Sequence, residues 1–240
     1  MCKYAIVTGA ASGIGKAIAE QLSKNKVVVF GIDKKDFSID GVRSIIGDVS
    51  DNSFMEKCSC IIKKTTEQID YLVIAAGILC DGNRNYIISL SLTEWNNVLS
   101  TNLTGAMLSL QMAAPFLKKS KNASVVLFSS DQVLRPVAKS GAYSISKAGI
   151  EALTKLASME LLNYRIRVNC IRAAAVDTDF LSTLVPDISV RREMTKTMAG
   201  KMPLGMISPH DVENLAFFLL SEDSDKITGQ VLTIDSGYLL

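Results

Sequence analysis

The chain has 240 residues, of which 48% are hydrophobic and 21% charged, a balance typical of globular proteins and not of disordered ones. Its 26 Lys and Arg residues exceed its 24 Asp and Glu residues by only two, so the charge gives no indication of nucleic-acid or membrane-surface binding. No apolar run reaches the roughly 20 residues that a membrane-spanning helix needs.

Five cysteines at scattered positions predict neither a disulfide framework nor a four-ligand zinc site. Only Cys58 and Cys60 are close in sequence, and we interpret them as ordinary thiols. A strand-like run begins almost at the first residue, which leaves no room for a signal peptide. We therefore expect a soluble, cytoplasmic protein without a metal site.

Short runs rich in Val, Ile and Leu alternate with helix-length segments along the chain. The predicted strands are 3–8, 27–33, 42–49, 71–77, 124–130, 166–173 and 230–235, and the predicted helices are 15–24, 51–66, 93–118, 141–163 and 210–221. Continuous apolar runs indicate strands buried on both faces, and their alternation with helices indicates parallel βαβ units. We predict one doubly wound α/β domain over residues 1–240, with a seven-stranded parallel sheet covered by helices on both faces.

The segment "TGAASGIG" follows the first predicted strand and contains Gly9, Gly13 and Gly15. In sheets of this kind the ligand crevice lies outside the carboxyl ends of the strands. Glycines let the backbone approach a phosphate, and the next helix offers free N–H groups and the positive end of its dipole. The spacing G-x-x-x-G-x-G differs from the commoner dinucleotide fingerprint, but its place between a strand and a helix predicts nucleotide binding.

The second predicted strand ends at Asp33, twenty residues after Gly13. A carboxylate at this point can accept hydrogen bonds from both ribose hydroxyls of adenosine and would repel a 2′-phosphate, which favours NAD over NADP. Lys34 and Lys35 follow directly and can soften that preference. The alternative interpretation is a charged surface loop.

Small or polar residues follow the next two predicted strands as well. Asp48 offers a polar acceptor and Val49 an apolar wall for an adenine ring. Ala75, Ala76 and Gly77 would let a flat cofactor lie close to the backbone.

Ser130 is the last residue of the fifth predicted strand, and Tyr143 and Lys147 follow in "YSISK". On a helix, positions i and i+4 share a face, so Tyr143 and Lys147 either begin a half-buried helix or form a catalytic pair. Helical register alone leaves both interpretations open.

Taken in order, these motifs resemble the short single-domain branch of the short-chain dehydrogenases/reductases. The resemblance also rests on "TNLTG", "RIRVNCI", "VDT" and the closing "ITGQVLTIDSG", and it covers nearly the whole chain. It implies a Rossmann-type sheet, a nicotinamide cofactor, and a homo-oligomer, either a tetramer or a dimer, formed through helices 93–118 and 141–163.

The resemblance implies a catalytic tetrad of Asn102, Ser130, Tyr143 and Lys147. Tyr143 would be the general acid/base, and Ser130 would orient the substrate oxygen. A free tyrosine has a pKa near 10, and a lysine ammonium about 4 Å away would lower it by about 3 units. Asn102 would hold a water that feeds protons to Lys147.

The resemblance also implies a cofactor site on the strand ends, in which Thr178 would bond the carboxamide of the nicotinamide. Its residues would be Gly9, Ser12, Gly13, Ile14, Gly15, Asp33, Asp48, Val49, Ala75, Ala76, Gly77, Tyr143, Lys147, Val176 and Thr178. The chain departs from the family at Ile74, where Asn is common, and at Ala173–Ala174, where Pro-Gly is common. These changes predict an altered nicotinamide seat and not a loss of binding.

Residues 179–208 would form the lid over the substrate. Methionines recur in it every four residues, as a soft apolar cover or as core packing: Met194, Met198, Met202 and Met206. Arg191 and Arg192 could meet an anionic substrate, although solvated charge is the simpler interpretation. His210, the only histidine, begins a late helix, and we assign it no catalytic role.

We therefore predict an NAD(H)-dependent oxidoreductase that acts on a secondary alcohol or ketone. One alternative is an NADPH-dependent 3-oxoacyl thioester reductase, against which Asp33 and the lack of an arginine in the glycine loop argue. Another is a dinucleotide-binding sensor without turnover. The substrate pocket would be shaped by the lid and by residues whose mixed polarity does not identify the substrate: Leu79, Asp131, Gln132, Val133 and Leu134.

Overall fold

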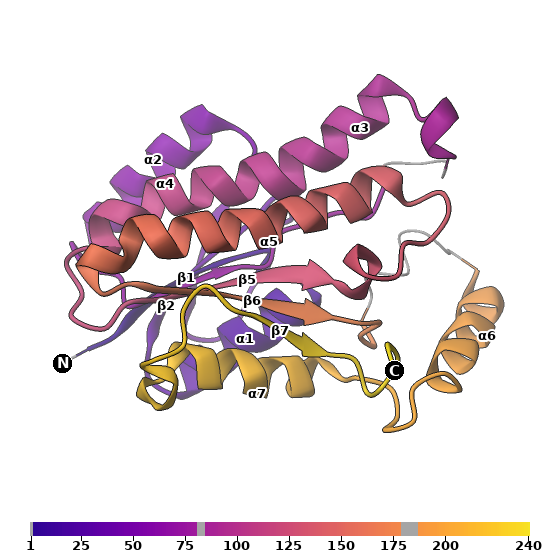
Figure 1. Ribbon diagram of the computed structural model, residues 1–240. Coiled ribbons are helices and arrows are strands. Elements are labelled where there is room, and N and C mark those ends of the chain that lie inside the picture. The colour runs from indigo at the N-terminus through magenta and orange to yellow at the C-terminus, as the bar shows by residue number, and fades with distance from the viewer. Residues whose placement is uncertain (1, 81–84, 179–186) are drawn as a thin grey trace.

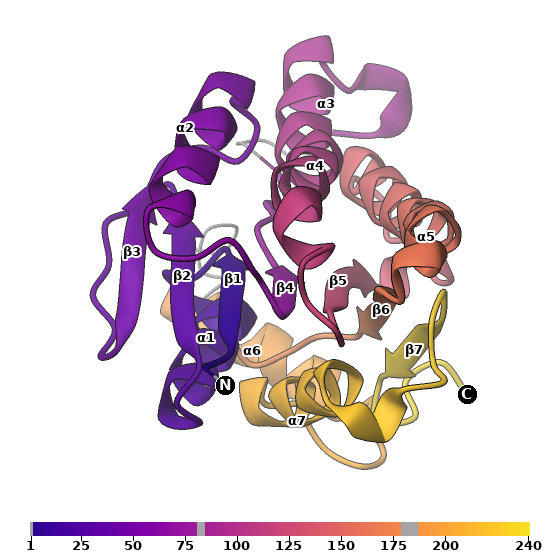
Figure 2. The ribbon, with the colours of Figure 1, turned by 90° about the vertical axis from the view of Figure 1, so that its left-hand side faces the viewer.

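The computed structural model describes residues 2–80, 85–178 and 187–240, and it contains one seven-stranded parallel sheet. The strands are β1 (Tyr4–Thr8), β2 (Val28–Asp33), β3 (Val42–Ile46), β4 (Tyr71–Ile74), β5 (Ser124–Ser130), β6 (Arg167–Ala173) and β7 (Val231–Ile234). Their order across the sheet is β3-β2-β1-β4-β5-β6-β7, with every neighbouring pair parallel (Figure 2). The predicted doubly wound fold is confirmed.

Helices cover both faces of the sheet (Figures 1 and 2). On one face lie α2 (Asn52–Lys63), α4 (Gly105–Leu117) and α5 (Gly141–Leu161), and α3 (Leu92–Leu99) leads into α4. On the other face lie α1 (Gly13–Lys24) and α7 (Pro209–Leu220). The remaining helix, α6 (Ile188–Ala199), lies beyond the carboxyl ends of the strands.

The continuous apolar runs of the central strands follow from this three-layer arrangement. Successive side chains of a strand point to opposite faces of its sheet. In β1, Ile6 packs into the cluster under α2, α4 and α5, whereas Val7 packs into the cluster over α1 and α7. In β4, Leu72 and Val73 divide in the same way. Both faces of these two central strands are therefore apolar.

The helix predicted over 93–118 spans 92–117 but is interrupted by a π-helical turn, Ser100–Thr104. Helix α6 lies in the segment predicted as a lid and was not predicted as a helix. Asp187 caps it by accepting hydrogen bonds from the N–H groups of Ser189 and Val190. Residues 179–186 of the predicted lid lie outside the described residues.

Within the described ranges, none of the helices combines the length and the apolar character that crossing a bilayer requires. The same residues contain no group of three or more His, Cys, Asp or Glu side chains placed to hold a metal ion.

Candidate active site

Ser130 and Tyr143 meet at the carboxyl edge of the sheet. Ser130 is the last residue of β5, and Tyr143 lies in the first turn of α5. Their side chains are hydrogen-bonded to each other and almost completely buried. Ser130 Oγ also donates to Asp131 Oδ1 at 3.0 Å and accepts from the N–H of Gln132 at 3.3 Å.

Lys147 lies one helical turn after Tyr143 and points to the same side of α5. Its Nζ donates a hydrogen bond to the Phe128 carbonyl oxygen at 2.9 Å and lies 5.6 Å from the centre of the Tyr143 ring. The side chain is only 8% exposed, so an ammonium group is held in a largely water-free environment.

Asn102 lies in the π-helical turn, a feature often found at functional sites. Its Oδ1 accepts from the N–H of Ile78 at 2.7 Å, and its Nδ2 donates to the Ile78 carbonyl oxygen at 2.8 Å and to Ser146 Oγ at 3.0 Å. A Cβ added to Gly77 would lie 3.3 Å from Asn102 Oδ1 and 3.6 Å from Lys147 Nζ. All four predicted tetrad residues therefore converge beside the end of β4.

Burial shifts the pKa values of the two titratable groups of this cluster, Tyr143 and Lys147, in opposite directions. It raises the pKa of Tyr143 to about 12, opposed by the hydrogen bond with Ser130 and reinforced by the Asp131 carboxylate. It lowers the pKa of Lys147 to about 8. The lowering of the Tyr143 pKa that the sequence suggested is not met in this arrangement, because burial of the phenol outweighs the hydrogen bond with Ser130.

The glycine loop is packed closely against the end of β4. Gly9 has φ +72°, and a Cβ there would lie 2.7 Å from the Ala76 nitrogen. A Cβ on Gly15 would overlap the Gly9 carbonyl oxygen. The N-terminus of α1 is therefore held next to the strand ends with no side chain between. This cradle fits the diphosphate of a dinucleotide, which a helix N-terminus favours.

Asp33 at the end of β2 lies against the same loop. Its Oδ2 accepts from the N–H of Ala11 at 3.0 Å, and its Oδ1 accepts from the N–H of Lys35 at 2.9 Å. Lys34 is paired instead with Asp48, at 3.0 Å between Nζ and Oδ2. Partial burial raises the pKa of Asp48, but hydrogen bonds from Ser50 and the Lys34 ammonium outweigh it and hold the pKa below its usual value.

The other residues predicted for the cofactor site differ in how they are placed. Val49 is buried and faces α4, where a Cβ on Gly105 would lie 2.7 Å from its Cγ2. Ser12 precedes α1 without a capping hydrogen bond from its side chain. Thr178 lies beside the loop, since a Cβ on Gly13 would be 3.7 Å from the Thr178 side chain. Ile14 and Val176 belong to the core cluster over α1 and α7.

The structure shows how the chain accommodates its departures from the family pattern. Ile74 is buried in the core, and the ends of β1 and β4 are tied by Thr8, whose carbonyl and hydroxyl oxygens accept from the N–H groups of Ala75 and Ala76. Ala174 extends β6, because its N–H donates to the Ile234 carbonyl oxygen at 3.0 Å. Thr8 was not predicted from the sequence, although a hydroxyl directly before Gly9 was a usable signal.

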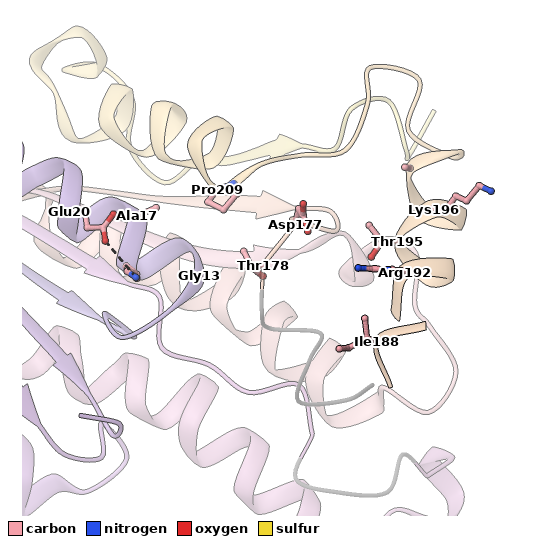
Figure 3. A pocket seen from close by; sticks show the side chains of 12 residues that line it. Gly13, Ala17, Glu20, Asp177, Thr178, Ile188, Arg192, Thr195, Lys196 and Pro209 are labelled. Atoms are coloured by element: carbon pink, nitrogen blue, oxygen red, sulfur yellow. Dashed lines mark ion pairs between the residues drawn. The ribbon is translucent and has the colours of Figure 1, made fainter. Parts of the chain in front are cut away.

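A cavity of about 780 Å³ lies between α1, α6 and the start of α7 (Figure 3). Gly13 and Thr178 form its inner wall, and Arg192 points into it from α6. Lys16 and Glu20 line it and form an ion pair at 3.7 Å. The cavity extends outward from the phosphate cradle and is lined by none of the tetrad residues.

Two further side chains, those of His210 and Trp95, are not part of the tetrad. His210 is in the first turn of α7, as predicted, with its Nδ1 3.7 Å from Glu213 Oε1. Trp95, in α3, packs on a small cluster formed by Leu79, Val98 and Tyr143.

Comparison with known proteins agrees with this geometry. A family model described as "Enoyl-(Acyl carrier protein) reductase" matches residues 9–239. The chain is a short-chain dehydrogenase/reductase. Enzymes of this family are oxidoreductases that use a nicotinamide dinucleotide.

Relatives within the short-chain dehydrogenases/reductases cover the whole chain. The 2,3-dihydro-2,3-dihydroxybenzoate dehydrogenase of Bacillus subtilis (strain 168) is 29% identical, over 99% of this chain and 96% of its own length. The 3-oxoacyl-[acyl-carrier-protein] reductase of Thermotoga maritima is also 29% identical, over 99% and 98%. The structure of ligand-free aldohexose dehydrogenase from Thermoplasma acidophilum superposes with a TM-score of 0.91 at 28% identity, over 99% of this chain and 94% of that one.

Proposed function

We propose that this protein is an NAD(H)-dependent oxidoreductase that transfers a hydride between nicotinamide and a secondary alcohol or ketone. The observation that carries the proposal is the convergence of Asn102, Ser130, Tyr143 and Lys147 beside the glycine cradle. When bound, the cofactor supplies or accepts the hydride. The protein must then move one proton to or from the substrate oxygen.

Tyr143 is the group that moves this proton. With a pKa of about 12 it is protonated at neutral pH, and it can donate its proton to a carbonyl oxygen during reduction. Ser130, which is hydrogen-bonded to Tyr143, holds the substrate oxygen beside the phenol. Alcohol oxidation needs a lower Tyr143 pKa, because the phenolate must accept the proton. Lys147 is a buried cation near the Tyr143 ring, and its ammonium can lower this pKa once it leaves the Phe128 carbonyl oxygen.

The cofactor preference for NAD follows from the charges around Asp33. Its carboxylate lies at the glycine loop, where it disfavours a 2′-phosphate. Lys34, which could favour that phosphate, is already paired with Asp48. Because Asp48 and Lys34 neutralise each other, the charge that disfavours the 2′-phosphate is that of Asp33.

Two alternatives remain open to test. Similarity to a 3-oxoacyl-[acyl-carrier-protein] reductase favours an NADPH-dependent thioester reductase, whereas Asp33 opposes it. A sensor that binds the dinucleotide without turnover would keep the cradle and not need the tetrad. The intact hydrogen-bonded cluster around Ser130 and Lys147 supports turnover.

The deciding experiment measures NADH and NADPH binding by fluorescence and turnover at 340 nm with a panel of secondary alcohols and ketones. We expect tighter binding of NADH than of NADPH, and turnover that falls by roughly 10²–10⁴-fold in Tyr143→Phe. Tighter NADPH binding would overturn the cofactor assignment. Binding without turnover of any alcohol, ketone or 3-oxoacyl thioester would favour the sensor.

We further propose a cytoplasmic homo-oligomer, dimer or tetramer, formed through α4 and α5. Large apolar side chains remain exposed on α5, among them Ile145, Leu156 and Met159, which supports burial of this helix between subunits. Light scattering after size-exclusion chromatography tests the oligomer, and fractionation of cells tests the location.

A further inference from the structure

Asp131 is a carboxylate placed directly beside the proton-transfer pair. It follows Ser130 at the carboxyl end of β5 and begins a short 3-10 turn, Asp131–Val133. Its Oδ1 accepts the Ser130 hydroxyl at 3.0 Å. The carboxylate also lies near enough to the Tyr143 hydroxyl to act on its ionisation. None of the steps proposed above uses this group.

The Asp131 carboxylate forms no ion pair within the described parts of the chain. Burial raises the pKa of Asp131 and the charge of Arg135, four residues along, opposes this rise, but the Arg135 guanidinium is held elsewhere. It lies 4.8 Å from the centre of the Tyr238 ring and donates to the Tyr238 carbonyl oxygen at 3.4 Å. A carboxylate has about four acceptor positions, and in the same parts of the chain this one is reached by the Ser130 hydroxyl and by the backbone N–H groups of Asp131 and Gln132. It therefore retains capacity to accept a hydrogen bond from a ligand.

We propose that Asp131 binds a second hydroxyl group of the substrate, on the carbon next to the reacting one, so that the preferred substrates are vicinal diols and polyols. This inference rests on the proposed function. The reacting oxygen must lie beside Ser130 and Tyr143, and Asp131 Oδ1 is one hydrogen-bond length from Ser130 Oγ. The two oxygens of a vicinal diol are separated by a similar length, so both can be held at once.

The second hydroxyl of the substrate also frees the Ser130 hydroxyl to donate to the reacting oxygen. The serine hydroxyl has one proton, and in the structure that proton is donated to Asp131. A substrate hydroxyl that donates to Asp131 in its place frees the Ser130 proton for the reacting oxygen. A simple alcohol leaves Ser130 bound to the carboxylate and loses this contact.

The surrounding charges favour a hydroxyl over a charged substituent. A substrate carboxylate next to the reacting carbon would be repelled by Asp131. A substrate ammonium would be attracted to Asp131 but would add a cation to a site that already buries Lys147. A neutral hydroxyl donates a hydrogen bond to Asp131 without charge repulsion and without burying a second cation.

The test compares pairs of alcohols that differ only by the second hydroxyl: propan-2-ol with propane-1,2-diol, and cyclohexanol with cyclohexane-1,2-diol. Amino- and carboxyl-substituted partners, 1-aminopropan-2-ol and lactate, complete the panel. We expect kcat/KM for each diol to exceed that of its partner by about tenfold or more, since a hydrogen bond to a charged group is worth that much. In Asp131→Asn this ratio should fall by about the same factor.

Glu67→Gln is the matched control, because it removes an exposed carboxylate before β4, at the opposite edge of the sheet. It should leave the diol preference unchanged. Equal kcat/KM for diols and simple alcohols, a preference unchanged in Asp131→Asn, or preferred turnover of 1-aminopropan-2-ol would each overturn the inference. If wild-type protein binds no NADH, the proposed function fails instead, so the two failures are distinguishable.

Discussion

Replacing Lys147 with methionine should remove turnover and at the same time stabilise the fold. Lys147 is 8% exposed and its pKa is lowered from 10.5 to about 8 by burial. At 1.36 kcal/mol per pH unit, this difference means that the charged lysine costs the folded state about 3 kcal/mol at pH 7. Methionine has a similar length and no charge.

The gain in stability of Lys147→Met is partly offset, because methionine cannot donate a hydrogen bond to the Phe128 carbonyl oxygen. That hydrogen bond is worth about 1 kcal/mol. The net expectation is about 2 kcal/mol of added stability at pH 7, or a rise in Tm of roughly 4–8 °C for a chain of this size. In the wild type, the unfolded chain binds more protons than the folded one between about pH 8 and 10.5. Wild-type stability should therefore rise with pH in that window, and the advantage of Lys147→Met should shrink.

Urea denaturation at pH 7, 8, 9 and 10 measures both effects, and Lys155→Met on the same helix is the control, because Lys155 is exposed. The control should leave stability unchanged within about 0.5 kcal/mol, the usual range for surface substitutions. A loss of stability in Lys147→Met at pH 7, or a difference from wild type that does not change with pH, would refute the reasoning.

Three further predictions follow from the site. Tyr143→Phe should lower turnover by roughly 10²–10⁴-fold while NADH binding, measured by fluorescence, is retained; equal turnover would remove the tyrosine from the proton path. Asp33→Ser should strengthen NADPH binding relative to NADH binding by about tenfold or more, because it removes one charge repulsion with the 2′-phosphate. An unchanged ratio of the two dissociation constants would contradict the role of Asp33. Gly9→Ala should destabilise the fold and abolish NADH binding, because the new Cβ would overlap Ala76 and the backbone at φ +72° would be strained. Gly205→Ala is the control, since Gly205 has φ +91° but open space around it, and thermal denaturation should show a loss of only about 1–2 kcal/mol of stability.

The strands could be expected from the sequence because burial on both faces leaves an unbroken apolar signal, whereas their order across the sheet was not predicted. The run 124–130 was predicted with its observed bounds, and Ser130 was placed at the carboxyl edge for the same reason. Helix α6 was missed because its mixed composition has no clear apolar stripe, although the Asp187 cap was readable.

The details of the site depended on contacts that no local pattern contains. The sequence predicted that Asn102, Ser130, Tyr143 and Lys147 would form one site, and the structure brings them together. It could not show that Lys147 bonds a carbonyl of β5, which becomes its neighbour only through the tertiary fold. The raised Tyr143 pKa has the same origin, since burial is a property of the packed molecule.

The π-helical turn Ser100–Thr104 has a consequence for how this chain can change in length. A π-turn holds one more residue than an α-turn, so deleting a single residue there would restore a regular helix. Because the turn absorbs its extra residue locally, α3 and α4 would keep nearly the same register, and the packing of α3 against Tyr143 would be retained. The deletion would instead displace Asn102, whose side-chain amide bonds the backbone of Ile78 from this turn. Single-residue deletions in the turn should therefore harm the site more than the fold.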